Sequence, residues 1–162
     1  NPQNERFFGM MIDYYSKPWM AAEKKVWLDD EIAKNPQNKM VWALKGELLM
    51  NDEKWDDAVE AYKKAVEIDP QFVQVIFNIG ISLNSKAIAL KDQLADKATG
   101  RLTVENNNKI LDVLKESKGY LEKLKDMDPN QEKTRWAYPL YQIYYSLGDE
   151  AKAAEMQSLL NK

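Results

Sequence analysis

The sequence contains no cysteine and no histidine among its 162 residues. Without cysteine the chain cannot form a disulfide, a thiolate zinc site or a thiol nucleophile. Without histidine it cannot place an imidazole base in a catalytic triad. These absences remove several common catalytic and metal-binding arrangements. They do not assign the protein to an oxidising or a reducing compartment.

The chain also lacks a charge excess of either sign and a long apolar run. Its 23 basic and 26 acidic residues give a net charge of −3 and are interspersed along the sequence. A nucleic-acid binder typically carries a basic face or tail instead. The longest uncharged run, residues 70–85, contains Gln, Asn and Ser and is too short and too polar to cross a bilayer. We therefore expect no nucleic-acid partner and no membrane insertion.

Glycine is scarce, and Gly46 and Gly80 stand alone within helical patterns rather than in a phosphate-binding loop. Acidic residues cluster at 29–31 and 52–57, but helix capping and solvated helix faces account for both clusters. The second cluster lacks the spaced oxygen ligands and the glycine of an EF-hand loop. No nucleophile is paired with a base, so we expect a protein that is not an enzyme and binds no cofactor or metal.

The prolines that are present carry a period. The tetrapeptide NPQN occurs at residues 1–4 and again at 35–38, and Pro2, Pro36 and Pro70 follow one another at intervals of 34 residues. The next Asx-Pro pair, at residues 128–129, comes one period plus 25 residues later. Since proline lacks a backbone N–H and disfavours helix in the preceding residue, each pair should end one helix and begin the next. The spacing predicts four units, the third with an insertion.

The second unit, residues 38–71, shows two amphipathic helical patterns separated by a turn at residues 51–52. It resembles the tetratricopeptide repeat, a helix–turn–helix unit of about 34 residues, although Lys45 stands where that family usually has Leu. Small residues such as Gly46 would let two helices approach closely, and Tyr62 would fill the wedge towards the next unit. The resemblance rests on Trp42, Gly46, Leu49, Ala58, Tyr62, Ala65 and Pro70.

The resemblance covers nearly the whole chain and implies an all-α solenoid of about four such helix pairs, with eight helices in a single domain. The units are expected at residues 4–37, 38–71, 72–130 and 131–162. The first is the weakest match, because Lys24 and Glu31 occupy positions that the family fills with Ala. The alternative is an unrelated helical bundle in which the Asx-Pro pairs are coincidental.

The 25 extra residues lie near 85–109, where apolar residues keep a helical spacing on both sides of Gly100. We expect both helices of the third unit to be longer by about three turns each. The first should continue to Ala98, and Thr103 should cap the second. The resulting hairpin is either a docking or dimerisation arm or an elaboration that packs only on itself. In the fourth unit, Pro139 predicts either a bent helix or a helix that begins just before it.

The family stacks its repeats into a right-handed superhelix and usually binds an extended peptide or a helix on the concave face, which the first helix of each unit lines. The resemblance therefore implies a non-catalytic protein–protein interaction scaffold that binds a partner peptide or helix in this groove. The alternative is a structural module that forms homo-oligomers through the hairpin at 85–109. The predicted groove residues are Arg6, Met40, Ala43, Glu47, Met50, Phe77, Ile81, Tyr138, Gln142 and Tyr145.

The start of the chain has the form of a unit boundary without the helix before it, since NPQN occupies residues 1–4. We therefore expect the C-terminal part of a longer repeat protein, of bacterial type by its resemblance. The alternative is a true N-terminus that repeats the boundary motif. No signal peptide is visible, and a cleaved leader or a trimmed chain would look the same. The sequence does not decide between bacterial cytoplasm and periplasm.

Overall fold

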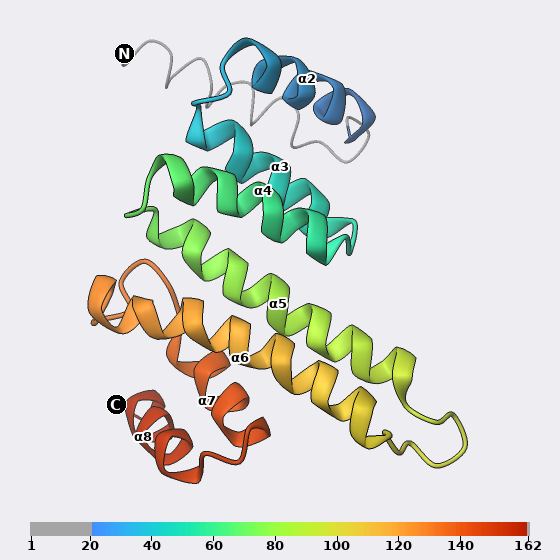
Figure 1. Ribbon diagram of the computed structural model, residues 1–162. Helices are drawn as coiled ribbons and strands as arrows, with labels where there is room; N and C mark the ends of the chain where they lie inside the picture. Colours follow the sequence, from blue (N-terminus) through green and yellow to red (C-terminus); the bar gives the residue numbers. More distant parts are fainter. Residues whose placement is uncertain (1–20, 162) are drawn as a thin grey trace.

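A computed structural model describes residues 21–161, and every regular element within them is an α-helix (Figure 1). The first helix of the first unit and the predicted groove residue Arg6 lie outside the described residues. The helices are α2 (Ala21–Lys34), α3 (Lys39–Asn51), α4 (Trp55–Ile68), α5 (Val73–Leu94), α6 (Val104–Met127), α7 (Ala137–Ser146) and α8 (Glu150–Leu160).

The helices form a stack in which each packs mainly against its neighbours in sequence (Figure 1). Three groups of buried apolar residues follow one another along this stack. The first joins α2 to α3, the second joins α4 to α5 with partly buried side chains of α3, and the third joins α5, α6, α7 and α8. Such nearest-neighbour packing defines a helical solenoid. The predicted all-α solenoid is confirmed.

The Asn-Pro boundary at residues 35–38 separates α2 from α3 and is held by the first turns of α3. Asn38 is the N-cap of this helix, and its side-chain oxygen accepts a hydrogen bond from the N–H of Met40 at 3.1 Å. Trp42 Nε1 donates to the carbonyl of Pro36 at 2.8 Å. These bonds satisfy groups that a helix start would otherwise leave exposed. The Trp of the repeat pattern thus anchors the boundary as well as the core.

Tyr62 fills the space between its own helix pair and the next, as predicted. It is fully buried, and a Cβ built on Gly46 of α3 would lie only 2.5 Å from its ring. Asn78 of α5 donates a hydrogen bond to its hydroxyl at 3.5 Å. Burial, together with the negative charge of Glu47, raises the pKa of this phenol. Tyr62 therefore remains neutral and packs three helices together.

The third helix pair is elongated, as predicted. Helix α5 has 22 residues and α6 has 24, against 13 in α3 and 14 in α4. The inner halves of α5 and α6 take part in the stack, and their outer halves project beyond it as a hairpin (Figure 1). As at Gly46, a glycine lets two helices approach closely, here α5 and α6. A Cβ on Gly80 of α5 would lie 2.5 Å from the side chain of Leu121 of α6.

The loop at the tip of this hairpin begins earlier than predicted. The continuation of helix to Ala98 is wrong, since α5 ends at Leu94. The side chain of Asp96 accepts hydrogen bonds from the N–H groups of residues 98 and 99, at 3.1 and 2.8 Å, and this turn competes with further helix. Gly100 adopts φ +67° in the loop. Thr103 caps α6 as predicted, because its Oγ1 accepts from the N–H of residue 106 at 3.2 Å.

Among the described helices, α5 is the one long and apolar enough to cross a membrane, with a mean hydropathy of 1.3. It lies between α4 and α6, and half of its apolar side chains are buried, namely Val73, Val75, Ile76, Ile79, Leu83 and Ala87. Its composition is therefore accounted for by its position in the core of the stack.

Helix α7 begins just before Pro139 rather than bending around it. Because α7 starts at Ala137, Pro139 lies in its first turn, where the missing N–H removes no helical hydrogen bond. Pro139 is buried there. The structure thus shows the second of the two alternatives for this segment.

The loop between α6 and α7 is organised by one buried carboxylate, Asp128, which is 5% exposed. Its side chain accepts hydrogen bonds from the N–H groups of Glu132, Lys133 and Thr134, and its carbonyl accepts from Trp136 Nε1 at 2.7 Å. Burial alone would raise the pKa of Asp128, but the hydrogen bonds, with those from Thr134 foremost, outweigh it and hold this pKa below its usual value.

Candidate functional site

Helix α7 presents an aromatic face to solvent. Tyr138 is 55% exposed and Tyr145 is 70% exposed, with Gln142 between them. Gln142 Nε2 donates to the hydroxyl of Tyr138 at 3.3 Å. On the other side of the helix, Leu140 and Ile143 are fully buried. The amphipathic spacing therefore divides α7 into a core face and a mostly exposed face that carries two tyrosines.

The predicted groove residues of α5 lie beside this helix. Phe77 and Ile81 are half-buried, and Phe77 packs against the group of buried residues that includes Leu140 of α7. Helices α5 and α7 are in direct contact. The two predicted stripes, one on each helix, thus belong to adjoining parts of the stack.

The predicted residues of α3 continue the series towards the N-terminal side. Met40 is 39% exposed and Glu47 is exposed, whereas Ala43 and Met50 are half-buried and pack against the apolar group formed by α4 and α5. None of the predicted groove residues within 21–161 is buried. That these side chains together line one binding groove stays a prediction.

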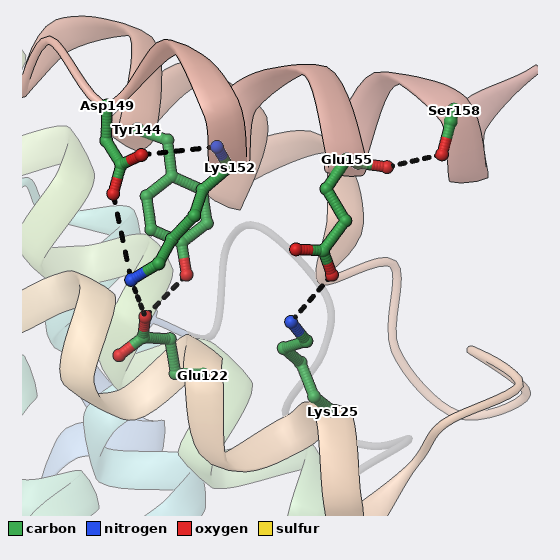
Figure 2. Close-up of polar contacts among 7 residues, drawn as sticks. All are labelled: Glu122, Lys125, Tyr144, Asp149, Lys152, Glu155 and Ser158. Atoms are coloured by element: carbon green, nitrogen blue, oxygen red, sulfur yellow. Dashed lines mark hydrogen bonds and ion pairs between the residues drawn. The ribbon is translucent and has the colours of Figure 1, made fainter.

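Polar contacts between α6, α7 and α8 hold the aromatic helix in place (Figure 2). Tyr144 of α7 donates a hydrogen bond to the carboxylate of Glu122 in α6. Lys152 of α8 lies 3.9 Å from Glu122, and Lys125 of α6 pairs with Glu155 of α8 at 2.9 Å. Burial, followed by the bond to Glu122, raises the pKa of Tyr144. The phenol therefore stays protonated and keeps donating to the carboxylate.

A pocket of about 370 Å³ opens where the outer half of the hairpin passes the end of α7. Gln142 is the one predicted groove residue within 21–161 that lines this pocket, and the other lining residues were not among those predicted. On α5, the lining residues Asn84, Ile88 and Lys91 follow Phe77 and Ile81 at intervals of three or four residues. The helical period could therefore have identified them. The lining consists of Asn84, Ala87, Ile88, Lys91, Leu102, Asn107, Ile110, Leu111, Leu114, Gln142 and Ser146.

The described residues contain no group of three or more acidic side chains that could hold a metal ion. Their perturbed carboxylates, such as Asp69, Asp96 and Asp128, make hydrogen bonds that organise turns and boundaries. The displaced pKa values are therefore explained by structure rather than by acid–base chemistry. The expected lack of enzymatic activity and of cofactors stays a prediction.

Comparisons with known proteins agree with this architecture. The family model described as tetratricopeptide repeat matches residues 40–72. The chain is 32% identical over 95 residues to the peroxisomal targeting signal receptor of Kluyveromyces lactis, covering 51% of this chain and 16% of the receptor. It is 31% identical over 48 residues to the receptor of Saccharomyces cerevisiae, covering 30% of this chain and 8% of that protein. The chain thus spans a small fraction of either receptor, and these yeast relatives leave the predicted bacterial origin untested.

Solved structures extend the likeness to most of the chain. A monomeric IFIT1 mutant with Gppp-AAAA and a second such mutant with m7Gppp-AAAA each superpose with a TM-score of 0.74 at 21% identity. Each match covers 90% of this chain and 31% of IFIT1. At this identity the match describes the fold. With the tetratricopeptide repeat at residues 40–72 and the stacked helix pairs around it, the chain is an α-helical solenoid of the tetratricopeptide-repeat type.

Proposed function

We propose that this chain is a non-catalytic interaction scaffold that binds a peptide or helix of a partner protein along α3, α5 and α7. The observation that supports it best is the pair of exposed tyrosines on α7, Tyr138 and Tyr145. Aromatic side chains with a polar tip are enriched at interfaces, since they bury large areas and order few rotatable bonds on binding. Phe77 and Ile81 on α5 add apolar surface beside them.

The scaffold presents these side chains on a rigid support. The buried residues of α7 pack in the core of the stack. Tyr144 of α7 and Lys152 of α8 also contact Glu122 of α6 and so tie the three helices together (Figure 2). A surface that is ordered before binding loses little conformational entropy when the partner arrives. The partner segment then bears most of the ordering cost, as is common for flexible peptides.

The charge of the surface favours a protein partner over a nucleic acid. Among the predicted groove residues within 21–161, the one charged side chain is the acidic Glu47. Phosphate backbones are held by Lys and Arg, and binding weakens steeply when these are few. The structures of IFIT1 hold Gppp-AAAA and m7Gppp-AAAA, whereas none of the predicted groove residues of this chain within 21–161 is Lys or Arg. We therefore assign the groove to an apolar or amphipathic protein segment.

The double variant Tyr138→Ala with Tyr145→Ala is expected to weaken peptide binding about tenfold, because two exposed anchors are removed. Peptides are first selected on the unmodified chain from a phage-displayed random dodecapeptide library, and their affinities are then measured by fluorescence anisotropy. Val104→Ser serves as the control, since Val104 is 80% exposed but lies on the hairpin. The helical melt of each variant should match that of the parent chain.

The same anisotropy assay includes a capped oligoadenylate as a second ligand. Undiminished peptide binding by the double tyrosine variant would contradict the groove assignment. Binding of the capped oligoadenylate that depends on Tyr138 and Tyr145 would instead assign the surface to nucleic acid. The protein-binding proposal expects the parent chain to retain no measurable affinity for the oligoadenylate.

The second candidate function is assembly through the hairpin, and two exposed apolar residues on it favour this alternative. Ile88 is 57% exposed and Val104 is 80% exposed. The scaffold proposal expects multi-angle light scattering to report a monomer for the parent chain and for the double variant Ile88→Lys with Val104→Lys. A dimer that dissociates in the double variant would support the assembly function instead. Singly exposed apolar residues are common on monomers, which is why the scaffold is preferred.

A further inference from the structure

The pocket at the end of α7 is a product of the hairpin. Its floor is formed by the buried residues Ala87, Ile110 and Leu114, which lie on the facing sides of α5 and α6. Ile88 and Leu111 form walls above them. The outer halves of these helices extend past α7 (Figure 1), and Gln142 and Ser146 of α7 also line the pocket. The volume of about 370 Å³ lies at the lower end of the range of about 300–1,000 Å³ for ligand pockets.

The rim of this pocket is polar and carries a positive charge. Lys91 is the one charged residue of the lining, and its ammonium group pairs with no carboxylate of the described chain. Its neighbours on the hairpin differ, since Lys86 pairs with Asp56 and Lys109 pairs with Glu105. A cation beside an apolar floor is complementary to an acidic side chain next to an apolar one.

The rim also offers free amide groups. The side chains of Asn84 and Asn107 line the pocket and make no hydrogen bond to other residues within 21–161. Ser146 is different, because its Oγ donates to the carbonyl of Gln142 at 2.8 Å. Amide N–H groups near a lysine can donate to the same carboxylate, and such charge-assisted bonds are stronger than neutral ones. The chemistry of the rim therefore suits an acidic group better than a basic one.

The pocket is continuous with the proposed groove. On α5, Asn84, Ile88 and Lys91 follow Phe77 and Ile81 at intervals of three or four residues, so they lie on the same face of the helix. On α7, Gln142 belongs both to the exposed tyrosine face and to the lining of the pocket. A segment bound along the groove would reach the pocket at the hairpin end.

We infer that this pocket is the anchor site of the groove and takes a large apolar side chain of the partner segment, with an adjacent Asp or Glu paired to Lys91. This inference rests on the proposed function and adds the chemistry of the partner to it. The apolar side chain is buried on the floor formed by α5 and α6, where contact energy is concentrated. The acidic neighbour sets the direction of the segment, because Lys91 lies towards the tip of the hairpin and Glu47 lies at the other end of the groove.

The test uses the peptides selected from the random dodecapeptide library. They are expected to share a large apolar residue next to Asp or Glu. Lys91→Glu should weaken their binding about tenfold, whereas Lys97→Glu, the same charge change in the exposed tip loop, should leave it unchanged. Replacing the acidic residue of the peptide with Lys should restore binding to Lys91→Glu, a recovery that a merely structural effect would not give.

A second variant blocks the pocket without altering its charge. Ser146→Trp adds a large side chain at the exposed end of α7 and should weaken binding of the same peptides. If neither Lys91→Glu nor Ser146→Trp alters affinity while the double tyrosine variant does, the anchor site is wrong and the groove stands. If the tyrosine variant also has no effect, or if no peptide is enriched, both proposals are wrong.

Discussion

Replacing Asp128 with alanine is expected to lower the free energy of unfolding by about 3 kcal/mol. The buried carboxylate accepts from the N–H of Thr134 at 2.7 Å, from its hydroxyl at 2.8 Å, and from the N–H groups of Glu132 and Lys133 at 3.0 and 3.2 Å. Alanine would leave these donors without an acceptor in a loop that must stay fixed for α7 to pack. Chemical denaturation followed by circular dichroism measures the loss.

Asp126→Ala is the matched control, since Asp126 is exposed and lies in the last turn of α6, two residues before Asp128. It should leave the unfolding free energy nearly unchanged. The effect of Asp128→Ala should also depend on pH. Because the folded-state pKa of Asp128 is held below the unfolded value of about 3.9, its stabilisation is present above that pH and is lost as pH falls through the folded pKa. A difference between parent and variant that does not shrink in acid would argue against the carboxylate as the cause.

Gly80→Ala is expected to destabilise the fold by about 2 kcal/mol, even though alanine favours helix. The new Cβ would lie 2.5 Å from Leu121, which is completely buried and has no room to move aside. Ser117 Oγ donates to the carbonyl of Gly80 at 2.7 Å, and this buried bond holds α6 against α5. The two helices would have to separate at the base of the hairpin. Thermal and chemical unfolding both report this change.

Gly119→Ala, on the neighbouring helix α6, is expected to change the stability in the opposite direction. Gly119 is also in a helix interior, but an added Cβ would meet nothing within 4 Å. The substitution should therefore stabilise the protein by up to about 1 kcal/mol through helix propensity alone. If Gly80→Ala and Gly119→Ala shift stability in the same direction, close packing at the base of the hairpin is not what selects glycine there.

Much of the fold could be predicted because the helix boundaries depend on local chemistry. Proline lacks a backbone N–H and disfavours helix in the preceding residue, so the period of Pro36 and Pro70 located the helix pairs. The spacing of small and large residues likewise indicated which side chains would be buried, as Tyr62 and Gly46 illustrate. Exposure of Tyr138 and Tyr145 followed from the same helical period.

Features that depend on side-chain hydrogen bonds or on the tilt of distant helices could not be predicted in this way. The periodicity continued to Ala98, but the turn formed by Asp96 ended α5 at Leu94. The organisation of the α6–α7 loop by Asp128 depends on an arrangement of N–H groups that no local pattern reveals. The pocket requires the end of α7 to meet the outer half of the hairpin, and that depends on how successive pairs stack.

The elongated hairpin also divides the scaffold into parts of unequal stiffness. By helical rise, α6 is about 36 Å long, and its inner half takes part in the stack, whereas its outer half projects beyond the stack beside α5 (Figure 1). In the outer halves of α5 and α6, at residues 84–94 and 104–115, the buried residues are Ala87, Ile110 and Leu114. Segments with few buried contacts open locally at low free energy. We therefore expect the pocket wall formed by the outer half of the hairpin to move more readily than the wall formed by α7, so that the tip could adjust to a bound segment while the tyrosine face of α7 stays fixed.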